Sequence, residues 1–398
     1  MKRDIGDLAL FGGRPSFLRP LHVNTPNNFD RDRLYERLDW ALDNRWLSNA
    51  GPLVLEFEER VAELAGTKHC IATCNATVAL HLLVRAAGLT GEVLMPSLTF
   101  SATAHSVRWL GLEPVFCDID PETGCVDPAE VEAKITERTS AIFAVHLWGQ
   151  VAAVEELTAI GERHGIPVYF DAAHAIGCTL EGKPVGGFGA AEVFSFHATK
   201  MVSAFEGGAI TTDDDELAAV LRGLKNFGKG LPEGHEMGGT NGKMSEASAA
   251  MGLTSLESYE RSLSHNKHNY AAYESELDSI PGVRLFTGTT PETNNQQYAV
   301  VEVDEEVTGI GRDLLMQVLR AENVMVIPPI GAPACHEIEP YRRTPVPLPH
   351  TERLTARVMA LPTGSTVGRE QVRRVCDIIR CAVANGPAVR AGQHRSAA

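Results

Sequence analysis

A lysine and an aspartate stand at the ends of two short apolar stretches, about thirty residues apart. Lys200 follows Val193-Phe194 and a polar turn, and the glycine pair Gly207-Gly208 comes shortly after it. Asp171 ends the apolar run of residues 168–170 and is followed by small residues. A buried lysine is costly unless it is paired or used covalently, because desolvation disfavours its charge. The pair therefore indicates a chemical role.

The run before Asp171 predicts a buried parallel strand that delivers a carboxylate at its carboxyl end, the edge where open α/β sheets bind ligands. A lysine and a carboxylate at one such edge are the two protein groups that pyridoxal phosphate chemistry requires. Lys200 would form a Schiff base with the aldehyde, and Asp171 would keep the pyridine nitrogen protonated. For Lys200 considered alone, a surface lysine in a polar loop is the alternative.

Two further stretches offer contacts for a phosphate and a ring. Asn75-Ala76-Thr77 opens a helix expected at Val78 to Ala87, so the free backbone N–H groups and the Thr77 hydroxyl are predicted to face an anion. An N-cap alone is weak evidence, since nearly every helix has one. Phe100 follows another predicted strand, where its ring could stack on a planar ligand or simply pack in the core.

Strands and helices alternate along the first two thirds of the chain. Strands are expected at residues 69–73, 92–95, 114–117, 141–145, 168–171 and 208–212, and helices at 30–44, 53–65, 78–87, 127–134, 151–164, 213–226 and 245–259. This alternation predicts a parallel sheet. No G-x-G-x-x-G follows the first strand, which disfavours a dinucleotide-binding fold.

The composition changes around residues 261–267, and the remainder predicts a smaller α/β unit. Helices are expected at 269–277, 312–321, 352–359 and 370–383, with strands at 298–303 and 324–327. We therefore predict a large domain at residues 1–257 and a small C-terminal domain at 258–398. The polar tail 386–398 is expected to be disordered.

Composition limits the possible partners. The chain has 398 residues, 44% of them hydrophobic, and a net charge of -15, which disfavours nucleic acid and anionic membranes. No signal peptide or stretch of membrane-spanning length is present, so we expect a cytoplasmic protein. Eight cysteines without C-x-x-C pairs favour reduced thiols over disulfides or a metal site.

Three motifs taken together, Ser195-Phe-His-Ala-Thr-Lys200, Asp171-Ala-Ala-His174 and Cys74-Asn-Ala-Thr77, resemble those of the DegT/DnrJ/EryC1/StrS sugar aminotransferases. The resemblance extends from about residue 8 to about residue 385. It implies a pyridoxal phosphate-dependent transferase of fold type I, α/β in class. Such a protein has a large domain around a mainly parallel seven-stranded sheet and a smaller C-terminal α/β domain.

The resemblance also implies roles for particular residues. Lys200 matches the lysine that binds the cofactor covalently, and Asp171 matches the partner of the pyridine nitrogen. The other matching cofactor positions are Ala76, Thr77 and Ser195 at the phosphate, Phe100 on the ring, His174 near the ring hydroxyl and Asn241, which reaches the phosphate from a partner subunit. A homodimer with shared active sites follows from this last position.

Further motifs resemble one branch of the family. They are Arg33 to Asp39, Trp46 to Asn49, Gly51 to Val54, His146 to Gly149 and Met251 to Leu256. That branch implies a ping-pong reaction, with pyridoxamine phosphate as the intermediate cofactor form. Glutamate would donate its amino group to C4 of dTDP-4-keto-6-deoxyglucose, giving dTDP-4-amino-4,6-dideoxyglucose for deoxysugar and antibiotic biosynthesis.

Three alternatives share the fold. A C3-specific aminotransferase would differ in the ketone that it accepts. A sugar dehydratase of this fold would have a histidine at the position of Lys200. A non-catalytic regulator would lose the pair of Lys200 and Asp171, and both are present. The candidate sugar contacts are residues 46–49, 294–298 and 327–336, each of which could equally be a surface loop.

Overall fold

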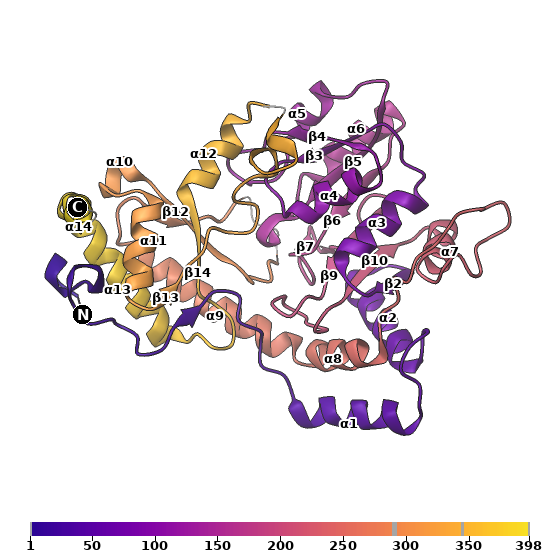
Figure 1. The fold of residues 1–398 in the computed structure, drawn as a ribbon, viewed down its shortest axis with the longest axis horizontal. Coiled ribbons are helices and arrows are strands. Elements are labelled where there is room, and N and C mark those ends of the chain that lie inside the picture. The colour runs from indigo at the N-terminus through magenta and orange to yellow at the C-terminus, as the bar shows by residue number, and fades with distance from the viewer. Residues whose placement is uncertain (1, 289–292, 344–345, 397–398) are drawn as a thin grey trace.

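The computed structural model describes residues 2–288, 293–343 and 346–396, and its largest feature is a seven-stranded sheet (Figure 1). The spatial order of the strands is β2-β10-β9-β6-β5-β3-β4. Their bounds are β2 His69–Thr73, β3 Glu92–Pro96, β4 Glu113–Cys117, β5 Thr139–Val145, β6 Val168–Asp171, β9 Ala191–Ser195 and β10 Gly208–Thr212. The predicted sheet is confirmed, and Ala191–Ser195 completes it.

Only β10 runs against its neighbours in this sheet, which is otherwise parallel where the described strands pair. Ala209 of β10 lies opposite Phe194 on one side and Ala72 on the other. Because β9 and β10 are antiparallel, the chain between them turns at the carboxyl end of β9, the same edge at which β6 ends. Lys200 lies in this turn.

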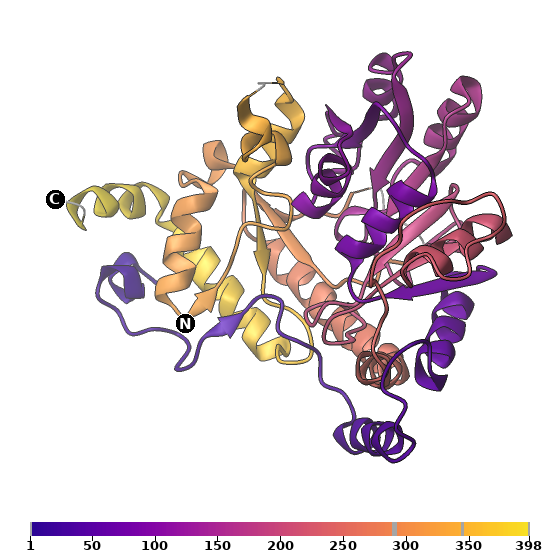
Figure 2. The same ribbon diagram turned by 45° about the vertical axis from the view of Figure 1, so that its right-hand side comes forward.

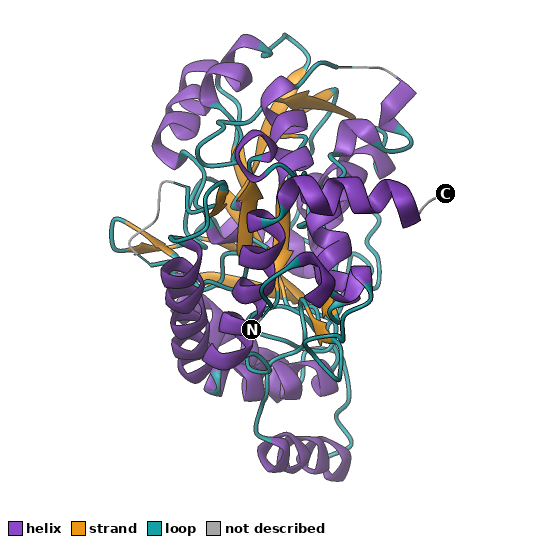
Figure 3. Cartoon of the chain, turned by 90° about the vertical axis from the view of Figure 1, so that its left-hand side faces the viewer, coloured by secondary structure: helices purple, strands orange, loops and turns teal. Residues whose placement is uncertain are grey.

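Helices cover both faces of the sheet (Figure 3). Val168 and Phe170 of β6 pack into one buried cluster, whereas Tyr169 packs into another, as alternation along a strand requires. The first cluster includes residues of α2 (Pro52–Ala65), α5 (Pro128–Ala133), α6 (Val154–His164) and α8 (Glu246–Glu257). The second includes residues of α3 (Ala76–Ala86), α4 (Ser101–Trp109) and α7 (Asp215–Leu224). Burial on both faces explains the continuous apolar strands.

Helix α1 (Arg31–Asp43) packs along α8 at the periphery of the molecule (Figures 1 and 2). Arg37 joins them by a hydrogen bond to the Thr254 hydroxyl and an ion pair with Glu257. The outer part of α1 exposes large apolar side chains, among them Trp40 at 41% and Leu42 at 61%. This face therefore leaves apolar area in contact with solvent in the single chain.

The C-terminal third forms a third buried cluster around a small antiparallel sheet of order β11-β12-β14. Its strands are β11 Val283–Leu285, β12 Ala299–Val303 and β14 Val358–Leu361. The helices of this part are α9 Tyr259–Leu277, α10 Glu305–Thr308, α11 Arg312–Ala321, α12 Pro349–Arg357, α13 Arg369–Ala384 and α14 Gly386–Ser396. The shorter pairs are β1 (Leu21–His22) with β13 (Val324–Met325), and β7 (Thr179–Leu180) with β8 (Lys183–Pro184).

Three local features of this third of the chain differ from expectation. Residues 260–268, which were left between the helices expected at 245–259 and 269–277, belong to α9, where Leu263 and Asn266 are buried. Met359 belongs to strand β14, since it pairs with Val301 of β12. Residues 386–396 of the tail expected to be disordered form α14, which buries Val389, and residues 397–398 lie outside the described residues.

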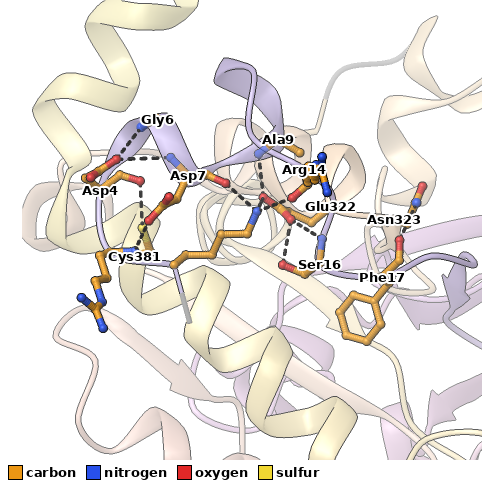
Figure 4. A network of polar contacts seen from close by, with 12 residues as sticks. Asp4, Gly6, Asp7, Ala9, Arg14, Ser16, Phe17, Glu322, Asn323 and Cys381 are labelled. Carbon is orange, nitrogen blue, oxygen red and sulfur yellow. Dashed lines mark hydrogen bonds and ion pairs between the residues drawn. The ribbon is translucent and has the colours of Figure 1, made fainter.

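The N-terminal segment is fastened to this third cluster by one buried carboxylate (Figure 4). Glu322 accepts hydrogen bonds from the backbone N–H groups of Ala9 and Ser16, both at 2.7 Å, and pairs with Lys2 Nζ at 2.8 Å. Leu8 and Phe17 belong to the same apolar cluster as α11 and α13. The segment, which we expected in the large domain, therefore contacts the C-terminal part. The boundary at residues 257/258 stays a prediction.

Along the described chain, no helix has both the length and the apolar character needed to cross a bilayer. Each of the eight cysteines is free, and all but Cys74 are buried.

Candidate active site

A cavity of about 270 Å³ opens where the predicted site residues meet. Larger surface hollows lie away from these residues, of about 530 and 750 Å³ on the C-terminal part and its N-terminal segment and of about 310 Å³ around Val151. The side chains around the smaller cavity come from β6, β9, the N-termini of α3 and α4, and the turns after β6 and β9. Its lining includes seven of the eight predicted cofactor residues: Ala76, Thr77, Phe100, Asp171, His174, Ser195 and Lys200.

Asp171 ends β6 with its carboxylate buried. The hydroxyl of Thr103 donates to Oδ2 at 2.8 Å, and the backbone N–H of Ala173 donates to Oδ1 at 3.1 Å. Burial raises the pKa of Asp171, while these hydrogen bonds and the charge of Lys200 act in the opposite direction. A cation beside the carboxylate would favour its ionised form, and a protonated pyridine nitrogen is such a cation.

Lys200 is likewise buried, with 8% of the residue exposed. Burial lowers the pKa of its ammonium from 10.5 to about 8, although the charge of Asp171 raises it. The hydroxyl of Tyr298 lies 3.2 Å from Nζ. A lysine with such a pKa has a substantial neutral fraction near physiological pH, and the neutral amine is the form that attacks aldehydes.

The N-terminus of α3 forms one wall of the cavity. Asn75 caps it, accepting from the N–H of Val78 at 2.8 Å, so the first-turn N–H groups of Ala76 and Thr77 remain for an anion. Gly208 allows β10 to approach closely, because a Cβ at that position would lie 2.5 Å from the nitrogen of Ala76. The donor groups therefore suit a phosphate.

His174 lies in the turn after β6 and is buried. The backbone N–H of Trp148 donates to its Nδ1 at 3.3 Å, which leaves the ring proton on Nε2. Burial sets the pKa of His174 well below the usual value, and the charge of Lys200 lowers it further. The ring is therefore a neutral hydrogen-bond donor at the cavity.

Two of the predicted cofactor residues, Phe100 and Asn241, are exposed to solvent in the single chain. Phe100 lines the cavity from the N-cap of α4, yet 58% of the residue is exposed, so stacking on a ring stays a prediction. Asn241 is exposed, pairs with Asn226 in an isolated bridge and is absent from the lining of this chain's cavity. Its action from a partner subunit also stays a prediction.

Sequence reasoning missed Thr103, and it placed Tyr298 and Ile330 only in candidate sugar-contact stretches. Thr103 lies in the first turn of α4, whose sequence shows no functional pattern, and Tyr298 lies directly before strand β12 in the distant C-terminal part. Ile330, in the stretch 327–336, lines the cavity, and its carbonyl accepts from the indole N–H of Trp148 at 3.0 Å. The polar residues 294–298 were the sequence feature that could have pointed to Tyr298, but we interpreted them as a candidate sugar contact.

A mainly parallel sheet with a buried lysine and carboxylate at its carboxyl edge defines a pyridoxal phosphate-dependent transferase of fold type I, and solved structures of that class share the fold. Residues 29–380 match the DegT/DnrJ/EryC1/StrS aminotransferase family, to which the chain belongs. It is an aminotransferase of the sugar type, and pyridoxal phosphate is the family's cofactor.

Individual relatives agree with this assignment. DesI, crystallised with its TDP-sugar product, is 56% identical with a TM-score of 0.95 and matches over 98% of this chain and 100% of its own. DesV of S. venezuelae, solved with a ketimine intermediate, is 29% identical with a TM-score of 0.81 over 90% and 99% of the two chains. GDP-perosamine synthase of Caulobacter vibrioides is 40% identical over 254 residues, 62% of this chain and 67% of its own.

Proposed function

We propose that the protein transfers the amino group of glutamate to C4 of dTDP-4-keto-6-deoxyglucose, giving dTDP-4-amino-4,6-dideoxyglucose. The observation that carries the proposal is the 56% identity, over 98% of the chain, to an enzyme whose crystals hold a TDP-sugar product. The cavity supports it, because the donor set for a phosphate, a pyridine nitrogen and an aldehyde is present around one space.

The covalent role in this proposal belongs to Lys200. Pyridoxal phosphate, when bound, supplies an aldehyde for this amine and a ring that accepts the electron pair released at the carbon beside nitrogen. With the cofactor bound, Nζ of Lys200 would hold it covalently. Once free, Nζ would take the proton from the α-carbon of glutamate, and it would move a proton in the opposite sense when the sugar is aminated.

The neighbouring residues bind and orient the cofactor. Asp171 stabilises a proton on the ring nitrogen, with Thr103 and Ala173 fixing its two oxygens. His174 donates Nε2–H to an anionic ring oxygen, which its neutral state permits. The first turn of α3 and Ser195 bind the phosphate. Phe100 covers the outer side of the ring.

A homodimer with shared sites is part of this proposal. Asn241 is exposed and outside its own chain's cavity, so it is free to reach the phosphate of a partner subunit. The apolar side chains on α1 provide surface for association. The dimer would cover these side chains and complete the phosphate site at once.

The experiment uses purified holoenzyme, glutamate and dTDP-4-keto-6-deoxyglucose, with the product solved by NMR. We expect nitrogen at C4 and stoichiometric 2-oxoglutarate, and no turnover by Lys200→Arg. Nitrogen at C3 would establish the C3-specific alternative instead. Because a GDP-perosamine synthase is also similar, the GDP-linked ketosugar is tested in parallel. Exclusive use of that substrate would overturn the choice of nucleotide.

A further inference from the structure

A short segment of the C-terminal part, Asn295–Tyr298, lies against the residues of the active site. Asn295 is fully buried, and Gln297 and Tyr298 are exposed by only 7% and 5%. The side-chain nitrogen Nδ2 of Asn295 donates to the backbone carbonyls of His174 and Ile176, at 2.9 and 3.1 Å. The segment is therefore fixed to the turn after β6 and is not a surface loop.

Gln297 fastens the same segment to the lysine turn. Its Nε2 donates to the carbonyl of Thr199 at 3.1 Å, and its Oε1 accepts from the N–H of Met201 at 2.9 Å. These two residues flank Lys200 in the sequence. One side chain thus holds the backbone on both sides of the lysine, which fixes the direction in which the lysine leaves the chain.

Tyr298, the next residue after Gln297, contacts the reacting amine of Lys200. Its hydroxyl lies 3.2 Å from Nζ of Lys200, and within the described ranges it is the single hydrogen-bonding group that Nζ contacts. The phenol ring packs at 59° against the ring of His174, with 4.8 Å between the centroids. Packing against His174 therefore holds the hydroxyl of Tyr298 beside the amine of Lys200.

The phenol suits both charge states of the amine. Burial lowers the pKa of Lys200 to about 8 and raises that of Tyr298 above its usual value. Tyr298 therefore keeps its proton throughout the range in which Lys200 titrates. A protonated phenol donates to the lone pair of a neutral amine and accepts from an ammonium, so it can remain bound to Nζ before and after a proton moves.

We propose that Tyr298 is a further catalytic residue, whose hydroxyl holds the free Nζ of Lys200 in the proton-transfer position in both charge states. No proton is passed to or from the phenol itself. The inference rests on the proposed function, in which Lys200 is the reacting amine. It deepens that function by assigning the group that positions the amine whenever it is not bound to the cofactor.

The test compares Tyr298→Phe with the wild-type protein in two measurements. The first follows, by absorbance, the rate at which the cofactor-free protein captures pyridoxal phosphate as a function of pH. Charge-assisted hydrogen bonds are the stronger ones, so losing the hydroxyl disfavours the ammonium more than the amine. We expect the pH at half-maximal capture to fall by about one unit. The second measurement is steady-state turnover, with kcat about ten- to hundredfold lower and KM for glutamate nearly unchanged.

A matched control removes a buried phenol hydroxyl elsewhere. Tyr273 is fully buried and donates to the carbonyl of Pro362 at 2.7 Å, in the C-terminal cluster. Tyr273→Phe is expected to leave the capture profile in place. Tyr298→Leu serves as a second variant without the hydroxyl, should the phenylalanine variant not fold. An unchanged profile together with unchanged kcat in a folded Tyr298 variant overturns the inference.

Borohydride reduction separates this failure from failure of the proposed function. If the cofactor is trapped on Lys200 in wild type and in Tyr298→Phe, the lysine assignment stands and the capture profile decides the role of the hydroxyl. If digestion locates the trapped cofactor on a different lysine in the wild-type protein, both the assignment and the inference are overturned.

Discussion

Replacing Lys200 with methionine is expected to stabilise the cofactor-free protein at pH 7. The ammonium is buried, and the fall of its pKa from 10.5 to about 8 measures how strongly the fold opposes its charge. At roughly 1.4 kcal/mol for each pH unit, this opposition costs about 3 kcal/mol. Methionine also forfeits the hydrogen bond to Tyr298, worth about 1 kcal/mol. The free energy of unfolding should therefore rise by about 2 kcal/mol.

The sign of the pH dependence follows from linkage. Because the pKa is lower in the folded state, wild type carries the full cost below about pH 8 and loses it as pH rises toward 10.5. The advantage of Lys200→Met should therefore shrink above pH 8 and vanish near pH 10. Urea unfolding of both cofactor-free proteins at one protein concentration measures it at pH 7 and pH 10.

A second buried lysine supplies the control with the opposite sign. Lys225 Nζ pairs with Glu58 at 2.7 Å and donates to the carbonyl of Ala72 at 2.9 Å. Lys225→Met leaves the buried carboxylate with one cation fewer, and breaking such a pair costs about 3 kcal/mol or more. If Lys200→Met is no more stable than wild type at pH 7, or if its advantage is the same at pH 10, the reasoning about the buried charge is refuted.

Four further predictions concern the supports of the site and the protein's association. Thr103→Val removes the donor to Asp171 Oδ2 and should lower kcat about tenfold with little change in melting temperature; equal turnover would contradict the orienting role. Gln297→Leu should slow borohydride-detected cofactor capture, since it releases the backbone on both sides of the lysine; a wild-type rate would argue against this. Leu42→Glu should yield monomers in sedimentation if α1 forms the dimer surface, and an unchanged mass excludes that surface. Glu322→Gln should lower the free energy of unfolding by about 2 kcal/mol, because it removes the buried partner of Lys2, and an unaltered urea midpoint would show the N-terminal attachment to be dispensable.

The lysine and the aspartate could be predicted from sequence because their placement depends on a local rule. A short apolar run ending in Asp171 forms a buried parallel strand, and the carboxyl ends of such strands share one edge. The turn carrying Lys200 reaches that edge because β9 also runs parallel to β6. Periodicity and edge geometry sufficed for both residues.

The contacts from the C-terminal part could not be predicted in this way. Tyr298 reaches Lys200 across about a hundred residues, and nothing near it in sequence specifies that meeting. The continuous helix through residues 260–268 could not be predicted for a related reason. These residues were left between two expected helices, whereas Leu263 and Asn266 are buried in α9 and Asn266 donates to the carbonyl of Asn295.

The burial of Lys200 also gives newly made chains a chemical criterion for taking up the cofactor. In an unfolded chain this lysine has the ordinary pKa near 10.5, like the other lysines, and is almost wholly protonated at neutral pH. Completion of the fold lowers the pKa to about 8 and so raises the neutral fraction at pH 7 by about two orders of magnitude. Since only the neutral amine attacks an aldehyde, the proposed attachment of the cofactor to Lys200 would favour mature chains over nascent ones. Under that proposal, cofactor occupancy would report completed folding.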